Sequence, residues 1–431
     1  MHSSPEDYTH SSFEAALARA KVGERLSPAD ALELLTTGSD SDGIDTSRKQ
    51  KVLMVADQRR QETVGDQVTF VANMNNNLTN ICDVGCLFCN YHKTTSSIAN
   101  GSKGGYIKSP RQSTEAVQKA IKMGISEVCS VSGLHPGLAL DQSHQDILAD
   151  SSAKFSDETL GFSSTYVDHI RAMNIDDIHI HAINPAEAHH AQRHADWGYR
   201  HVYERLSECG LNSVPGTAAE ILVDDIRDQI CPNKISSESW IAAMEAAADV
   251  GLDLTTTIMY GHVESTKDRI QHLDRIRRLQ DRTGAVTEFI PLKFMHKETP
   301  LHHDGTVSES TTRHEDELLT AVSRLFLDNI DHIQASWVKY GDSRALQLLN
   351  CGADDFMGTV LSEEITASAG GEHGNFRSFT EYVDMISAID RIPVERSADY
   401  CRLHSIDIEN QPYGPTIGPR ADGSPMLPSK S

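Results

Sequence analysis

The sequence predicts an α/β fold in which eight parallel βα units close into a full or nearly full (β/α)8 barrel. From Val68 onward, short segments rich in β-branched and aromatic residues alternate with amphipathic stretches long enough for crossover helices. A run of three cysteines directly follows the first of these segments. Active sites of such barrels lie at the carboxyl ends of the strands, so this run stands where chemistry is expected.

The expected elements follow one another along the chain. Residues 1–65 form an N-terminal helical cap, because apolar positions such as Phe13, Leu17 and Leu32 recur at helical spacing and stop at glycine-containing breaks. The barrel spans residues 66–365. Its eight expected strands are 68–73, 127–132, 178–183, 212–215, 255–260, 288–294, 332–337 and 356–360. The longest helical stretches between them are 185–208 and 266–281.

The chain is expected to end in two further parts. Residues 366–405 form a C-terminal helical closure of the barrel. Residues 406–431 have the composition of a disordered tail, with Gly414-Pro415, Gly418-Pro419 and Gly423-Ser-Pro425.

Cys82, Cys86 and Cys89 follow a C-x3-C-x2-C spacing on one short loop. Three thiolates so spaced can bind three irons of a 4Fe-4S cluster, and no fourth cysteine occurs before Cys129, so the last iron keeps an open position. An S-adenosylmethionine (SAM) chelated there can accept an electron and split to methionine and a 5′-deoxyadenosyl radical. The motif therefore predicts radical chemistry.

A structural zinc site and a disulfide framework are the alternatives for these cysteines. Zinc would need four closed ligands, for which His92 is the nearest fourth candidate. Disulfides are disfavoured because the chain is long, lacks a secretory signal and carries its other cysteines as singletons. These five are expected to be small buried apolar residues: Cys129, Cys209, Cys231, Cys351 and Cys401.

The formal net charge of −23 comes from 62 acidic and 39 basic residues spread along the chain. A field of this sign repels phosphate backbones and anionic lipids, so we expect neither a nucleic-acid nor a membrane partner. The diffuse acidity indicates a halophilic archaeal source, with an ordinary acidic enzyme as the alternative. The polar, acidic N-terminus predicts a cytoplasmic location, where thiols stay reduced.

Further motifs surround the cysteine run and stand at successive expected strand ends. They are Ala56-Asp-Gln-Arg-Arg60, Asn73-Met-Asn-Asn-Asn-Leu-Thr-Asn80, Val131-Ser-Gly-Leu-His-Pro136, Ile178-His-Ile-His-Ala182, Val214-Pro-Gly-Thr-Ala-Ala-Glu-Ile-Leu222, Ile230-Cys-Pro-Asn-Lys234, Met259-Tyr-Gly-His-Val-Glu264 and Thr287-Glu-Phe-Ile-Pro291. With these motifs the chain resembles the radical SAM enzymes, and among them the CofH family, a subunit of deazaflavin (FO) synthase.

The resemblance implies a radical SAM barrel that holds a 4Fe-4S cluster with SAM on its fourth iron. It also implies two substrates, L-tyrosine and 5-amino-6-(D-ribitylamino)uracil. In the family's reaction the deoxyadenosyl radical takes a hydrogen from tyrosine, the Cα–Cβ bond breaks, and the 4-hydroxybenzyl unit adds to carbon 5 of the uracil. The implied partners are the cyclising radical SAM subunit (CofG-like), which closes the deazaflavin chromophore, and an unidentified reductant.

Four residues are candidates for binding SAM. Phe88, between two of the thiolates, can lie against the adenine, although a core-facing apolar residue is the alternative. Ser132 and Gly133 offer a close backbone approach to the methionine amino group. Most relatives carry two glycines there, and Ser132 replaces the first. Gly216 follows the fourth expected strand, where free backbone N–H groups face the barrel mouth.

Five residues are candidates for substrate binding or catalysis. Glu220 is expected at the start of a helix that faces the barrel mouth, where it either binds polar groups or merely complements the helix dipole. His179 and His181 alternate with isoleucines, so both side chains face the same side of one strand. His135 and His262 stand at other strand ends.

The nearest alternative function keeps the chemistry and changes the substrate. The futalosine radical SAM enzymes of the menaquinone pathway share the barrel, but they usually carry two further glycines where this chain reads Gly216-Thr-Ala-Ala-Glu220. Two other functions are less favoured. A tyrosine lyase would not need a site for a ribityl-pyrimidine, and a non-catalytic iron-sulfur carrier would not need a large barrel.

Overall fold

The computed structural model describes residues 11–37, 46–150, 164–361, 365–368, 372 and 376–406. Its strands are β1 (Gln67–Val71), β2 (Asn73–Asn75), β3 (Glu127–Ser130), β4 (His179–Ala182), β5 (Ser213–Val214), β6 (Asp253–Tyr260), β7 (Val286–Lys293), β8 (His332–Ile333), β9 (Asp355–Gly358), β10 (Ile392–Arg396) and β11 (Leu403–Ser405). Its helices are α1 (Phe13–Lys21), α2 (Pro28–Leu35), α3 (Thr46–Val64), α4 (Thr95–Ala99), α5 (Pro110–Ile121), α6 (Gln142–Asp150), α7 (Tyr166–Met173), α8 (Pro185–Gln192), α9 (Tyr199–Ser207), α10 (Asp224–Ile230), α11 (Ser237–Asp249), α12 (Thr266–Thr283), α13 (Pro300–His303), α14 (Arg313–Phe326), α15 (Trp337–Tyr340), α16 (Asp342–Leu348), α17 (Ile365–Ser368) and α18 (Phe379–Ser387).

All eight expected strands are present and pair in parallel around a ring. The sheet runs in chain order from β2 to β8. An isolated bridge between Gln334 and Asp355 joins β8 to β9, and β9 pairs with β1, whose chain continues into β2. The pairings therefore close a (β/α)8 barrel, as the sequence predicts.

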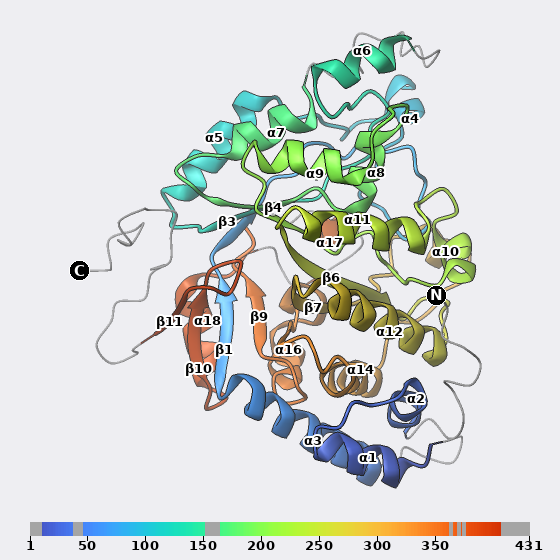
Figure 1. Cartoon of the computed structure of the whole chain (residues 1–431), viewed down its shortest axis with the longest axis vertical. Coiled ribbons are helices and arrows are strands. Elements are labelled where there is room, and N and C mark those ends of the chain that lie inside the picture. Colours follow the sequence, from blue (N-terminus) through green and yellow to red (C-terminus); the bar gives the residue numbers. More distant parts are fainter. Residues whose placement is uncertain are drawn as a thin grey trace.

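The helices cover this barrel as expected, with one break. Three helices, α1, α2 and α3, lie in the segment expected to form the cap; α2 packs on α12 and α14, α3 packs on α14, and α1 packs on α2 and α3 (Figure 1). The long helical stretch expected at 185–208 divides into α8 and α9, and His194 between them has a positive φ of 61°. No helix among the described residues is long and apolar enough to cross a membrane.

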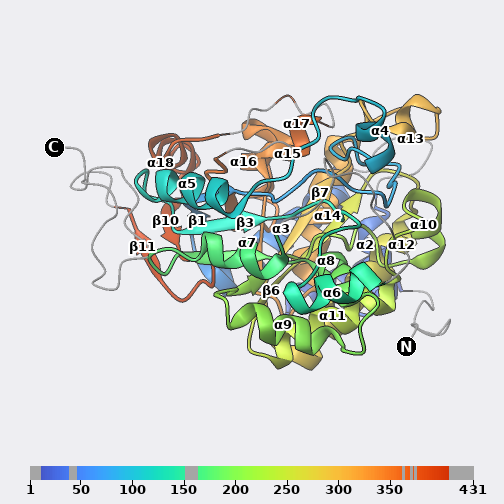
Figure 2. The same cartoon turned by 90° about the horizontal axis from the view of Figure 1, so that it is seen from above.

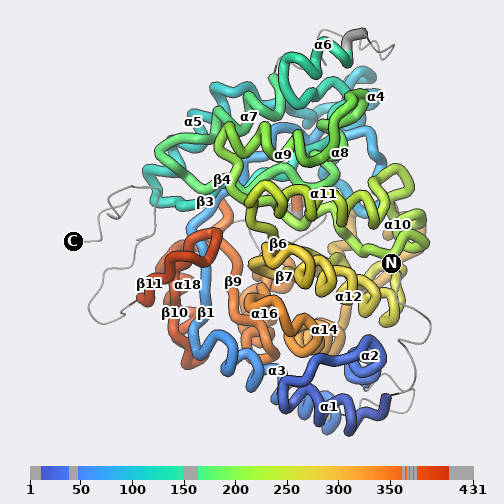
Figure 3. Tube along the Cα trace, in the orientation of Figure 1, coloured from blue at the N-terminus to red at the C-terminus, as the bar shows by residue number. Residues whose placement is uncertain are grey.

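The C-terminal closure differs from the purely helical one expected for residues 366–405. Helix α18 is present, but it is followed by β10, which pairs with β1, and by β11, which pairs with β10 in antiparallel fashion. Strand β1 thus lies between two strands from the far end of the chain (Figure 3). Cys401, expected to be buried, is exposed here. The tail expected from residue 406 onward lies, after Ile406, outside the described residues.

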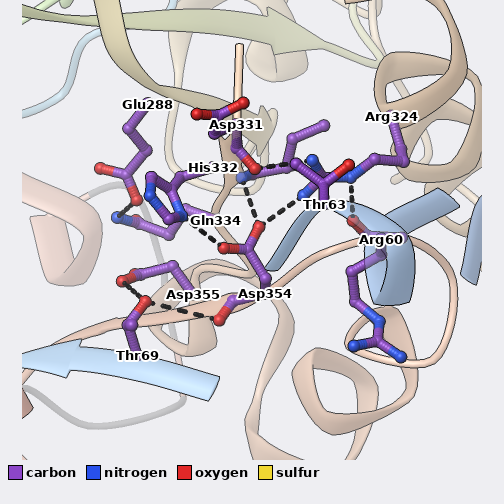
Figure 4. A network of polar contacts seen from close by, with 12 residues as sticks. Arg60, Thr63, Thr69, Glu288, Arg324, Asp331, His332, Gln334, Asp354 and Asp355 are labelled. Carbon is purple, nitrogen blue, oxygen red and sulfur yellow. Dashed lines mark hydrogen bonds and ion pairs between the residues drawn. The ribbon is translucent and has the colours of Figure 1, made fainter. Parts of the chain in front are cut away.

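Buried polar residues fill the amino end of the barrel. Asp354 accepts a hydrogen bond from the backbone N–H of Ile333 at 2.8 Å and contacts Nδ1 of His332 at 2.6 Å (Figure 4). Next to it, the Asp355 carboxylate accepts a hydrogen bond from Nε of Arg396 on β10 at 2.6 Å. The strand pair β10–β11 therefore closes the amino end of the barrel through charged side chains. Ligands can enter at the opposite, carboxyl end.

The loops that follow the barrel strands gather at that opposite end. Helix α4 follows β2, α10 follows β5 and α13 follows β7. Viewed from above, these three helices lie on one side of the molecule, and β10, β11 and α18 lie on the other (Figure 2).

Candidate active site

A cavity of about 270 Å³ lies at the carboxyl ends of the barrel strands. Its walls come from the loop after β2, from the ends of β3 to β7 and from α15. This is the end at which (β/α)8 barrels carry their active sites.

Cys82, Cys86 and Cys89 all line this cavity. Their loop is held by backbone hydrogen bonds: the N–H of Cys82 donates to the carbonyl of Lys93 at 2.9 Å, and that of Cys89 donates to Cys86 at 3.2 Å. Gly85 has a φ of 72°, which glycine adopts without strain, and turns the chain between the first two cysteines. Burial raises the pKa of the Cys82 and Cys89 thiols, so coordination of a cation is what would deprotonate them.

This donor set fits a 4Fe-4S cluster. All eight cysteines are free thiols. His92, the fourth zinc ligand considered from the sequence, directs Nδ1 to the carbonyl oxygen of Cys89 at 2.8 Å. In the described part of the chain, no three side chains of His, Cys, Asp or Glu converge on a single metal position. A cluster binds each cysteine through a different iron, so three thiols spread around one cavity suit it.

Glu220 lines the same cavity and forms an ion pair with Lys234, whose Nζ lies 2.5 Å from Oε1. Helix α10 begins only at Asp224, so Glu220 precedes the helix and is not the first-turn glutamate considered as the alternative. It stands in a turn with a positive φ of 48°, and its carbonyl accepts the N–H of Met259 at 2.7 Å. Non-glycine residues with positive φ often mark functional turns.

Lys234 is a cavity residue that the sequence analysis did not single out. Its Nζ lies 5.3 Å from the centroid of the Phe88 ring. Burial lowers the pKa of Lys234, but the charge and the hydrogen bond of the neighbouring Glu220 carboxylate raise it and keep the ammonium charged. Its charge is among those that most lower the pKa of each cysteine of the motif. In the sequence, Lys234 stands out only as the last residue of the Ile230-Cys-Pro-Asn-Lys234 motif. That motif has no ligand spacing or catalytic pattern that would identify Lys234 as a site residue.

Ser132 and Gly133 lie between β3 and the loop that carries the cysteines. The Ser132 hydroxyl accepts the N–H of Leu78 at 2.9 Å, and the N–H of Gly133 donates to the carbonyl of Thr79 at 2.7 Å. A Cβ atom on Gly133 would lie 2.6 Å from the carbonyl oxygen of Ile81, so only glycine fits. Ser132 therefore accepts a hydrogen bond from the segment that leads into the cysteine loop, which a glycine at this position could not do.

Phe88 lines the cavity, whereas Gly216 is not among the residues that line it. The N–H of Gly216 donates to Oγ1 of Thr255 at 3.1 Å, and a Cβ atom there would come within 2.4 Å of the Thr255 carbonyl oxygen. Gly216 thus lets β5 approach β6 closely. Thr217 and Ala218, the next two residues, face the cavity.

His179 and His181 share one face of β4, as predicted, because Nε2 of His179 and Nδ1 of His181 each lie 2.7 Å from the Ser213 hydroxyl. They lie deeper in the barrel than the cavity. His181 is in register with Cys129, whereas the cavity wall on β3 begins two residues later, at Val131.

His135 and His262 are also outside the cavity lining. Nδ1 of His135 accepts the N–H of Gly137 at 2.9 Å, and Nδ1 of His262 accepts the N–H of Val263 at 2.8 Å. Both rings therefore stabilise their own turns. The substrate contacts proposed for the four histidines stay predictions, and the structure offers other polar side chains at the cavity.

Two family models match this chain. The Radical SAM superfamily model matches residues 76–276, and the CofH/MqnC C-terminal region model matches residues 283–402. The 5-amino-6-(D-ribitylamino)uracil–L-tyrosine 4-hydroxyphenyl transferase of Haloarcula marismortui is 58% identical over 427 residues, which cover 97% of this chain and 95% of the relative. The chain belongs to the CofH family of radical SAM enzymes.

Other CofH-family relatives carry the same name. That of Halobacterium salinarum is 55% identical over 430 residues, with 98% of this chain and 95% of the relative covered. That of Methanocaldococcus jannaschii is 40% identical over 346 residues, with 80% and 90% covered. The first two relatives come from halophilic archaea, in line with the source that the net charge suggested.

Solved structures share the barrel at low sequence identity. Methylornithine synthase (PylB) superposes with a TM-score of 0.64 at 16% identity, covering 89% of this chain and 98% of that one. HydG, a maturase of the [FeFe]-hydrogenase, gives a TM-score of 0.64 at 14% identity, covering 92% and 78%. These likenesses support the fold. Membership of the radical SAM superfamily implies a 4Fe-4S cluster and SAM.

Proposed function

We propose that this CofH-family enzyme transfers the 4-hydroxybenzyl unit of L-tyrosine to 5-amino-6-(D-ribitylamino)uracil, a step in the biosynthesis of the deazaflavin chromophore FO. The observation that carries the proposal is the 58% identity, over nearly the full length of both chains, to a transferase named for these two substrates. The cavity supports it, since three thiols and several polar strand ends face one space.

The residues of the cavity divide into two groups by position. Cys82, Cys86 and Cys89 would hold the cluster, and Phe88 with the Ser132-Gly133 turn would hold SAM beside it. When bound, these groups supply a one-electron cleavage that yields a hydrogen-abstracting radical. Polar side chains from β4 to β7 and α15 surround the remaining space, where tyrosine and the pyrimidine would be positioned against each other.

The futalosine enzymes of the menaquinone pathway are the nearest alternative. The model that matches residues 283–402 describes CofH and MqnC together, so it does not separate them. The full-length identity to the transferases favours the tyrosine reaction. A non-catalytic iron-sulfur carrier is disfavoured, because the thiols open on a cavity at the mouth of a complete barrel.

Two partners belong to the proposal. The product of this reaction needs ring closure before it is a deazaflavin, so a second, CofG-like radical SAM enzyme would act on it. A reductant would supply the electron. Neither requires a nucleic acid or a membrane.

The test is an anaerobic assay of the reconstituted enzyme. Tyrosine with the ribitylaminouracil should give an adduct detected by mass spectrometry, together with 5′-deoxyadenosine. A futalosine-pathway substrate, supplied separately, should give none. Cys86→Ala removes an expected cluster ligand and should abolish both products, whereas Cys209→Ala, a buried cysteine away from the cavity, should keep them. Adduct formation from the futalosine-type substrate alone would overturn the proposal.

A further inference from the structure

The cavity is cationic in a strongly acidic protein. Among the described residues that line it, three are lysines, Lys234, Lys293 and Lys339, and one is a carboxylate, Glu220. The chain as a whole carries a net charge of −23. Because the protein as a whole is acidic, lysines that line its cavity indicate that its ligands carry anionic groups.

Lys234 lies at the end of the cavity that the cysteine loop lines. It forms the ion pair with Glu220 and contacts the Phe88 ring. Phe88 stands between Cys86 and Cys89 on the cysteine loop, whereas Lys293 stands at the end of β7 against the Tyr340 ring. The two lysines therefore serve different parts of the same cavity.

Lys293 stands at the last position of β7, and among the described residues no carboxylate forms an ion pair with it. Its Nζ lies 5.8 Å from the centroid of the Tyr340 ring. Burial lowers the pKa of Lys293, and among the described residues Asp316 is the carboxylate that counters this.

Asp316 is already engaged by other donors. Its Oδ1 accepts hydrogen bonds from the hydroxyls of Tyr260 at 2.8 Å and Thr311 at 2.6 Å, and its Oδ2 pairs with Arg344 at 2.5 Å. Within the described part of the chain, Lys293 is thus a partly buried cation that lies against the Tyr340 ring at the cavity wall and forms no ion pair. Burying an unpaired ammonium costs free energy, and a bound anion would offset that cost. This position therefore suits an anionic group of a ligand.

We propose that Lys293 binds the α-carboxylate of L-tyrosine. The inference rests on the proposed function, in which tyrosine is the substrate that carries an anion, since the ribitylaminouracil is neutral near pH 7. SAM also carries a carboxylate, but its expected position is on the open iron, at the cysteine end that Lys234 serves. Lys293 fixes the amino-acid end of tyrosine and so sets which part of the molecule meets the radical.

Tyramine provides the test, because it is tyrosine without the carboxylate. Dissociation constants for tyrosine, tyramine and SAM are measured by calorimetry on the anaerobic holoenzyme. The wild type should prefer tyrosine to tyramine. Lys293→Gln should weaken tyrosine binding about tenfold or more and leave tyramine and SAM binding unchanged. Lys293→Arg should recover part of the preference, and Lys119→Gln, the same charge change on the exposed face of α5, should have no effect.

Each other outcome overturns the inference. An unchanged preference for tyrosine in Lys293→Gln would show that the carboxylate binds elsewhere. Weaker SAM binding in this variant, with the tyrosine preference intact, would assign Lys293 to the SAM carboxylate. Failure of the proposed function is a separate result: the wild type would form no adduct from tyrosine and the ribitylaminouracil, whatever the binding constants show.

Discussion

Lys234 and Glu220 form an ion pair beside the cysteine loop, with 12% and 14% of their side chains exposed. Neither residue is a cluster ligand in our account, yet both line the cavity. We predict that Glu220→Ala keeps the iron content of the reconstituted protein and lowers coupled product formation about tenfold or more. It should also lower the free energy of unfolding by roughly 3 kcal/mol, because the Lys234 cation is left buried and unpaired.

A double variant separates folding from function at this pair. Glu220→Gln with Lys234→Met removes both charges and should restore most of the stability lost in Glu220→Ala. Product formation should stay low in the double variant if the pair acts on ligands. Recovery of product together with stability would show that the pair is only structural.

Gly133→Ala should weaken SAM binding by about tenfold, because the new Cβ would lie 2.6 Å from the carbonyl oxygen of Ile81 and must displace the cysteine loop or β3. Equilibrium binding of SAM to the reconstituted protein measures it. Gly198→Ala is the matched control, since a Cβ there meets nothing within 4 Å. Equal affinity in the two variants would contradict the placement of SAM at the Ser132-Gly133 turn.

The sequence predicted the barrel well because its strands combine β-rich composition with regular spacing between crossover helices. It missed β10 and β11 for a physical reason. Strand β10 includes Pro393, and its exposed first residue, Ile392, gives no alternation to recognise. Pairing with β1, more than three hundred residues earlier in the chain, is what makes this segment a strand.

The candidate site was predicted in part. The cysteines were found because ligand spacing within one loop is visible in sequence. The sequence does not show how deep in the barrel a side chain lies. The alternation of His179 and His181 gave their shared face correctly. The register of β4 against β3, however, places both histidines below the cavity. Lys234 and Lys293 were missed because a single lysine has no spacing to recognise, and its meaning depends on which carboxylates lie near it in space.

Acid should destabilise the fold through buried neutral histidines. Burial lowers the pKa of His169, His181 and His272 to about 3 each, from 6.5 in the unfolded chain. The unfolded state therefore binds protons that the folded state excludes. Stability from this source is complete above pH 6.5 and falls as the pH drops toward 3, by about 1.4 kcal/mol per pH unit for each histidine.

His272→Gln tests this dependence at one residue. Nδ1 of His272 accepts the N–H of Leu222 at 2.9 Å, and a glutamine carbonyl can accept the same bond without titrating. Denaturant unfolding between pH 7 and pH 4 should show a shallower loss of stability in the variant. Parallel curves for the variant and the wild type would contradict the assignment.

Salt should stabilise the fold. The net charge of −23 is spread along the chain, so carboxylates repel one another over about a Debye length, roughly 10 Å at 0.1 M salt and 3 Å at 1 M. The melting temperature should rise across a potassium chloride series up to molar concentrations. A flat or falling series would refute the interpretation that this acidity is an adaptation to salt.

The central claim is that the enzyme breaks tyrosine between Cα and Cβ and transfers the ring-bearing part to the pyrimidine. Two samples of tyrosine test it most directly, one labelled in the ring and one labelled at Cα, each incubated anaerobically with SAM, reductant and the ribitylaminouracil. We predict that the ring label appears in the adduct and the Cα label in the small released fragment. An adduct that carries both labels, or a ring label that stays in intact tyrosine while 5′-deoxyadenosine accumulates, would contradict the claim.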